Sequence, residues 1–109
     1  MHDSKFLSLL GMCRKAGKLS CGHDSSMESI RNHKACLCIL SCDSSQRLRK
    51  ETERECTFAQ LNVPLLTIES DMNEIGRATG LRSALLTVND QGFADAMFKA
   101  LNQTKEDEA

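Results

Sequence analysis

The chain has 109 residues, of which 40% are hydrophobic and 27% are charged, and its formal net charge is −1. This length suits one domain, and no apolar run approaches the roughly 20 residues of a membrane-spanning helix. Residues 1–50 hold nine Lys or Arg against four Asp or Glu, whereas residues 51–109 hold five against eleven. This asymmetry favours a polyanion-binding face on the first half, and chance combined with an acidic tail is the alternative explanation.

The first third of the chain shows two helical patterns joined by a short extended piece. The first helix ends at Gly17, and its inner positions recur at i, i+3, i+4 and i+7: Phe6, Leu9, Leu10 and Cys13. Charges on both sides of this short apolar patch argue against a signal peptide, so we expect a cytoplasmic protein. Residues 18–21 are predicted to be extended. The second helix is predicted over 23–33, with Met27 and Ile30 pointing inward.

The rest of the chain continues the alternation of helices and strands. Three strands are predicted, over 35–42, 63–68 and 84–88. A helix over 45–61 is capped by residues 43–45 and stopped by Asn62. A short helix capped by Ser70 and Asp71 ends at Gly80, and a last helix is capped by Asp90. Their inward helical positions are Leu48, Thr52, Cys56, Ala59, Met72, Ile75, Ala78, Ala94, Met97, Phe98 and Leu101. We expect an α/β domain over 1–103, a three-layer α/β/α sandwich with a mixed sheet of about four strands, and an acidic disordered tail over 104–109.

The six cysteines allow three interpretations. The apolar run at 35–42 predicts a buried strand with two faces, Cys36, Cys38, Leu40 and Cys42 on one and Leu37 and Ile39 on the other. We favour packing, because a free cysteine behaves as a small hydrophobe and a cytosolic protein rarely forms disulfides. The alternatives are a metal site or a thiol-redox enzyme that uses these cysteines with His23 or His33. We expect no cofactor and no metal.

The stretch LSCGHDSSMESIR, residues 19–31, leads from an extended piece into the second helix. A helix N-terminus has about four free backbone N–H groups and a partial positive charge, which suits an anion. Gly22 permits a close approach there. Five cations form a collar around this tip in the sequence: Arg14, Lys15, Lys18, Arg31 and Lys34. The structural alternative is an S-x-x-E capping box from Ser25 to Glu28, with Glu28 pairing with Arg31.

Several segments carry a resemblance by their order and spacing, among them KFLSLLGMCRKAGKLSCG at 5–22, NVPLLTIE at 62–69 and LLTVNDQGFADAM at 85–97. With them the chain resembles the kink-turn RNA-binding family of ribosomal proteins, the L-seven-Ae type, and within it the bacterial YlxQ-like subgroup. The resemblance implies the same α/β/α fold, no catalytic activity, and a structured RNA partner, of ribosomal type, bent at sheared G·A pairs. We expect a monomer without membrane contact.

The resemblance implies RNA contacts at the tip of the second helix and in the loop before the last strand. Carried over, these residues are Gly22, His23, Asp24, Ser25 and Glu28 at the tip, and Gly80, Leu81, Arg82 and Ser83 in the loop. The expected electrostatic attraction comes from Lys15, Lys18, Arg31 and Lys34. Glu28 stands where the family has a lysine, and a carboxylate there repels phosphate. A protein-interaction module on the same fold is the alternative function, favoured by Glu28 and the acidic second half.

Overall fold

The computed structural model describes residues 4–58 and 62–108, with side chains as far as Leu101. In chain order the elements are α1 (Ser4–Lys15), β1 (Leu19–Cys21), α2 (His23–Arg31), β2 (Leu37–Leu40), α3 (Gln46–Thr57), β3 (Leu65–Thr67), α4 (Met72–Thr79), β4 (Leu85–Val88) and α5 (Gln91–Glu108). This order confirms the predicted alternation of helices and strands.

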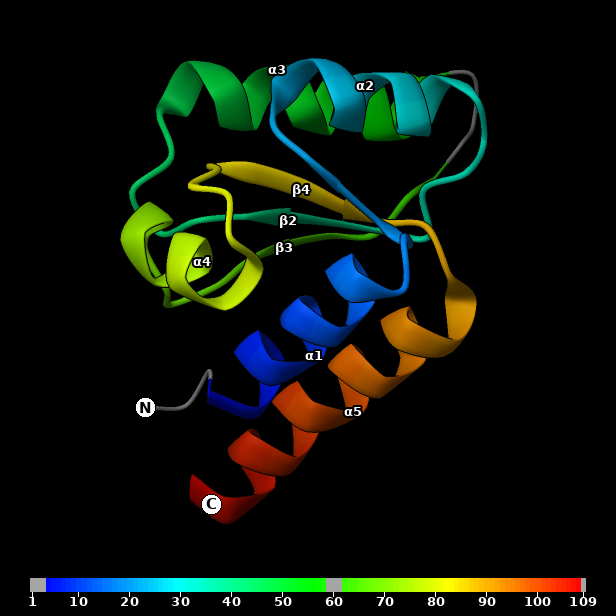
Figure 1. Cartoon of the computed structure of the whole chain (residues 1–109). Helices are drawn as coiled ribbons and strands as arrows, with labels where there is room; N and C mark the ends of the chain where they lie inside the picture. Colours follow the sequence, from blue (N-terminus) through cyan, green and yellow to red (C-terminus); the bar gives the residue numbers. More distant parts are fainter. Residues whose placement is uncertain (1–3, 59–61, 109) are drawn as a thin grey trace.

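In the described part of the chain, four strands form one mixed sheet in the order β1-β4-β2-β3. β1 and β2 each pair antiparallel with β4, whereas β2 and β3 are parallel. α2 and α3 cover one face of the sheet, while α1 and α5 lie on the other, with α4 beside α1 (Figure 1). The three-layer sandwich is therefore confirmed. Because α2 follows β1 and α3 follows the parallel strand β2, both helices begin at the same end of the sheet.

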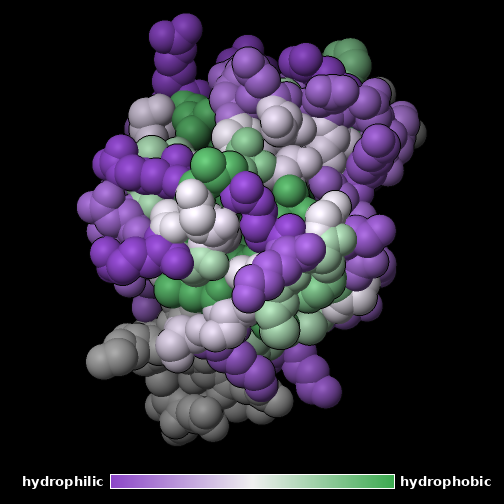
Figure 2. All heavy atoms as spheres, viewed as in Figure 1, coloured by the Kyte–Doolittle hydropathy of each residue, from purple (hydrophilic) through white to green (hydrophobic). Residues whose placement is uncertain are grey.

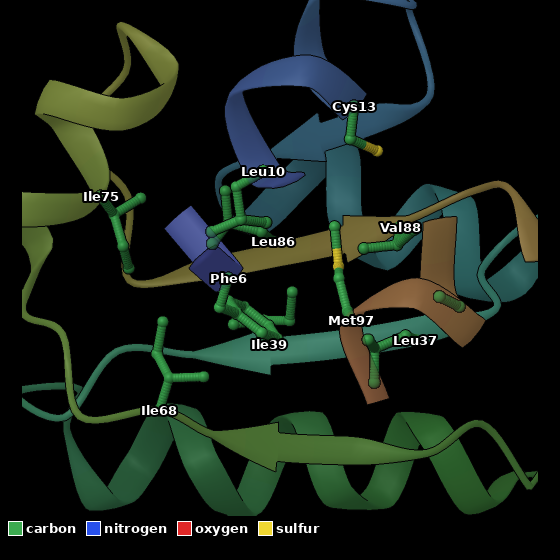
Figure 3. Packing of buried hydrophobic residues seen from close by; sticks show 11 residues of the cluster. Phe6, Leu10, Cys13, Leu37, Ile39, Ile68, Ile75, Leu86, Val88 and Met97 are labelled. Atoms are coloured by element: carbon green, nitrogen blue, oxygen red, sulfur yellow. The ribbon is translucent and has the colours of Figure 1, made fainter. Parts of the chain in front are cut away.

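Two clusters of buried side chains fill the spaces between the layers. The larger cluster joins α1, α4 and α5 to the sheet through residues such as Phe6, Ile75 and Met97 (Figure 3). The smaller cluster joins α2 and α3 to the opposite face. β2 contributes alternate residues to both, Leu37 and Ile39 to the larger cluster and Cys38 and Leu40 to the smaller one. The predicted alternation of these four side chains is confirmed.

Two cysteines depart from the face predicted for them. Cys36 packs against the larger cluster, opposite to Cys38, and Cys42 is exposed. The reason is that β2 covers only Leu37–Leu40, so the pleat does not extend to either residue. Cys38 and Cys56 are buried with their Sγ atoms 3.3 Å apart, in agreement with the packing interpretation.

The caps predicted for α3, α4 and α5 are present in the structure. Side-chain oxygens cap three helices, Ser45 at α3, Asp71 at α4 and Asp90 at α5. At α4 the Glu74 carboxylate also accepts the Asp71 N–H, which completes a capping box. Gly17 and Gly80 follow α1 and α4 with φ of 73° and 88°, as expected for glycine at a helix C-terminus.

Several sequence-based expectations about element boundaries and burial differ from the structure. α3 ends at Thr57 instead of residue 61, and the predicted inner residue Ala59 lies outside the described residues. Met72 and Ala78 are half-buried, not core residues. α5 is helical as far as Glu108, and this range includes residues 104–108, for which we expected a disordered tail. The domain limit near residue 103 stays a prediction. Among the helices described, none has the length and apolar character needed to cross a membrane.

Candidate nucleic-acid interface

The N-terminus of α2 has no side-chain cap. Its N-cap residue is Gly22, with φ of 92° and ψ of 169°, and no side chain there accepts a capping hydrogen bond. These backbone angles lie in a region that is essentially restricted to glycine. A Cβ at Gly22 would meet no atom within 4 Å, so this position faces open space. The first backbone N–H groups of α2 therefore have no side-chain cap.

The serines that follow Gly22 belong to the helix itself. Because α2 begins at His23, Ser25 lies in the first turn and the predicted capping box from Ser25 to Glu28 does not form. Ser26 is buried, and its hydroxyl donates to a carbonyl oxygen of β1 at 3.4 Å. The sequence could not reveal that α2 begins before Ser25, because the φ of Gly22 decides where the helix starts.

The predicted pairing of Glu28 with Arg31 is also wrong. Arg31 Nε instead donates to Glu55 Oε1 of α3 at 2.6 Å, and Glu28 is exposed. Helices α2 and α3 run side by side, so a residue 24 positions away replaces the local partner. The Arg31 charge is thereby neutralised at the end of α2 farthest from Gly22.

His23 joins the tip of α2 to α3. Its Nδ1 lies 2.9 Å from Asp24 Oδ1, and its Nε2 lies 2.8 Å from Glu51 Oε2. Both ring nitrogens donate to carboxylates only when the imidazole is protonated. The hydrogen bonds to Asp24 and Glu51 accordingly raise the pKa of His23 above its ordinary value. Glu51 gives no local signal in the sequence, because it reaches His23 only through the packing of α3 on α2.

The loop over residues 80–83 is held in place by its own contacts. The Thr79 hydroxyl lies 2.9 Å from the Ile75 carbonyl oxygen and accepts the N–H of Leu81 at 3.2 Å. Arg82 Nε donates to Asn73 Oδ1 of α4 at 2.8 Å. These contacts leave the Leu81 side chain 45% exposed. The loop thus presents an apolar side chain to solvent from a hydrogen-bonded backbone.

The tip of α2 and this loop lie next to each other. The N–H of Gly22 donates at 2.9 Å to the carbonyl oxygen of Leu85, two residues after the loop. Ala84 in turn accepts the N–H of Ser41 at the end of β2. The sheet therefore brings together two segments that are about 60 residues apart in sequence. The face of the molecule drawn in Figure 2 shows hydrophobic patches interleaved with strongly hydrophilic side chains.

The structure divides the predicted cationic collar. Lys18 precedes β1, and its carbonyl oxygen accepts the N–H of Asn89 at the far end of β4. Lys34 lies in the turn after α2, and its N–H donates to Ser29. The nine residues of α2 separate Arg31 from Gly22 by about 13 Å along the helix axis. Lys18, Arg31 and Lys34 thus lie at the opposite end of the sheet from the tip and do not surround it.

The residues of the metal and redox alternatives are spread over the molecule. Cys36 packs against one face of the sheet, Cys38 lies on the other, and Cys42 is exposed. His23 is occupied by two carboxylates. Within residues 4–58 and 62–101 no three His, Cys, Asp or Glu side chains are grouped as metal ligands.

Comparison with known proteins identifies relatives along the chain. The profile of the ribosomal protein L7Ae/L30e/S12e/Gadd45 family matches residues 4–98. The chain is 31% identical over 103 residues to the RNA-binding protein YlxQ of Bacillus subtilis (strain 168), covering 94% of this chain and 100% of the relative. It is 29% identical over 93 residues to the RNA-binding protein YlxQ of Enterococcus faecium, covering 85% and 87%.

Solved structures share the fold. A protein of unknown function from Bacillus halodurans superposes with a TM-score of 0.81 at 26% identity, covering 91% of this chain and 98% of that one. The Giardia lamblia 15.5kD RNA binding protein superposes with a TM-score of 0.74 over 96% of this chain and 88% of that one, at 15% identity. The second likeness concerns the fold alone.

Proposed function

The chain belongs to the ribosomal protein L7Ae/L30e/S12e/Gadd45 family, and from this we propose that it is a non-enzymatic RNA-binding protein. Its ligand is a structured RNA with a sharp, kink-turn-like bend, as in ribosomal RNA. The binding face consists of the α2 tip and the loop over residues 80–83. The names of its YlxQ relatives support RNA binding in general.

The observation that carries this proposal is the contact between the two segments. The hydrogen bond from Gly22 to Leu85 sets an uncapped helix N-terminus beside a loop with an exposed Leu81. The N–H groups of the helix can receive a phosphate, and Leu81 can pack on an unstacked base. Proteins recognise RNA through such a combination of backbone shape and splayed-out bases.

Carboxylates at the tip lower the expected affinity. Asp24 and Glu28 are exposed, and Glu51 lies against His23. Each negative charge near the path of the backbone opposes phosphate binding. We therefore propose weaker kink-turn binding than in a relative with a lysine at position 28.

The same carboxylates favour the second candidate function, a protein-interaction module with weak or lost RNA binding. An acidic tip suits a basic protein partner better than a polyanion. Partners that stay bound to the full chain after nuclease treatment, and that are lost with Glu28→Lys, favour this alternative. Partners released by nuclease favour RNA binding.

The test of the main proposal is a titration of the purified protein with a kink-turn RNA and with an unbent duplex of the same length. Both are measured at two salt concentrations, because phosphate contacts make affinity fall with salt. We expect tighter binding to the kink-turn RNA at both concentrations. Equal, weak binding to the two RNAs contradicts the proposal.

A further inference from the structure

One arginine outside both segments donates a hydrogen bond to the residue that precedes the loop, and its charge acts on the thiol of the residue that precedes Gly22. Arg14 lies in the last turn of α1. Its Nη1 donates to the carbonyl oxygen of Thr79 at 3.1 Å, one residue before Gly80. Burial raises the pKa of the Cys21 thiol, one residue before Gly22, and the charge and hydrogen bonding of Arg14 act in the opposite direction. Arg14 therefore sits at the junction of the α2 tip and the loop.

Arg14 differs from two cations of α2, His23 and Arg31, in the kind of partner that it contacts. His23 is engaged by two carboxylates, and Arg31 is paired with Glu55. Arg14 donates instead to a neutral carbonyl oxygen and lies beside a thiol. A guanidinium has five N–H donors in a planar fork, so these two contacts leave donors and the full positive charge available.

We propose that Arg14 holds the α2 tip against the loop and gives a charge-assisted hydrogen bond to an RNA phosphate that crosses their junction. This inference rests on the proposed RNA-binding function. A residue of α1 then makes a phosphate contact, whereas Glu28 of α2 repels phosphate. A bidentate fork suits this position, because one edge contacts the protein while another faces a phosphate oxygen.

A structural role alone is the competing explanation. The Thr79 carbonyl belongs to the last turn of α4, where carbonyl oxygens have no partner within the helix. Arg14 could simply satisfy this oxygen. The two explanations differ in salt dependence, because only a phosphate contact contributes to the slope of log affinity against log salt concentration.

The experiment measures the affinity for kink-turn RNA over a salt series with the full chain and three variants. Arg14→Gln removes the charge but keeps a donor for Thr79, and Arg14→Lys keeps the charge without the fork. Lys99→Gln, an exposed position on α5, is the control for the loss of one positive charge. Thermal unfolding checks that each variant is folded.

We expect Arg14→Gln to weaken binding by about tenfold or more and to reduce the salt slope by about 0.7–0.9, whereas Lys99→Gln changes both far less. Arg14→Lys should retain the slope and recover part of the affinity. An Arg14→Gln variant with the slope of the unmodified protein overturns the inference, whatever its affinity. If the unmodified chain does not prefer the kink-turn RNA over the duplex, the proposed function itself fails.

Discussion

The N-termini of α2 and α4 lie in the same small domain and are built in opposite ways. At α4 the Asp71 and Glu74 side chains satisfy backbone N–H groups in a complete capping box. At α2 the N-cap is Gly22, without any side-chain cap and open to solvent. The α4 end needs no further partner, whereas the α2 end leaves its N–H groups to water or a ligand. The difference marks which helix end stabilises the fold and which is available for binding.

The largest change in stability is expected from a substitution of Gly22, the N-cap of α2. Gly22→Asn should lower the free energy of unfolding by about 1–3 kcal/mol, because φ of 92° with ψ of 169° is strained for any residue with a Cβ. Gly80→Asn is the matched control, since its φ of 88° and ψ of −5° are left-handed angles that asparagine tolerates. Urea unfolding measures both. Equal losses in the two variants contradict the assigned backbone at Gly22.

The next largest change in stability is expected at the capped N-terminus of α4. Asp71→Ala removes the capping box and should lower the free energy of unfolding by about 0.5–2 kcal/mol. Ser25→Ala in the first turn of α2 should change it by no more than about 0.5 kcal/mol, because Ser25 caps nothing. Chemical denaturation of both variants provides the comparison. A Ser25→Ala loss as large as that of Asp71→Ala means that Ser25 does cap α2 in solution.

Reversing the charge of Glu28 tests the N-terminal part of α2 as a phosphate site. Glu28→Lys should strengthen the binding of kink-turn RNA and steepen the salt slope by about 0.7–0.9, since one phosphate contact replaces a repulsion. Glu53→Lys makes the same change of net charge at an exposed position of α3 and serves as the control. Similar gains in both variants indicate only a long-range charge effect and weaken the assignment of the site.

The smallest change in stability is expected at His23, the first residue of α2. The folded state raises the pKa of His23, so its stabilising contribution is complete below the unfolded pKa of about 6.5 and is lost as the pH rises through the folded pKa. The side chain is 47% exposed, so this contribution should stay below about 1 kcal/mol. His23→Gln should therefore destabilise the protein more at pH 5.5 than at pH 8.5.

Unfolding by urea at a series of pH values measures this difference. His33→Asn is the control, because it removes another histidine at a position whose φ of 61° asparagine tolerates. A His23→Gln effect that is equal at every pH contradicts the bridge to Asp24 and Glu51.

The fold could be predicted from sequence because its signals are local. The spacing of Phe6, Leu10 and Cys13 defines the buried face of α1, and Asp71 with Glu74 defines the start of α4. Short-range periodicity and capping chemistry decide such elements.

The site could be predicted only in part, because its contacts are tertiary. Gly22 and Leu81 follow from the family resemblance, but the partners of His23 and Arg31 lie on α3. Helix packing, and not sequence spacing, selects Glu51 and Glu55. For the same reason the cations that are neighbours of Gly22 in sequence are divided between two ends of the sheet.

The most direct test of the RNA-binding face is an NMR titration that follows backbone amide signals as kink-turn RNA is added. We predict that the largest chemical-shift changes fall on residues 22–25 and 80–83. Changes confined to the opposite end, around Lys18, Arg31 and Lys34, or spread evenly over the surface, contradict it.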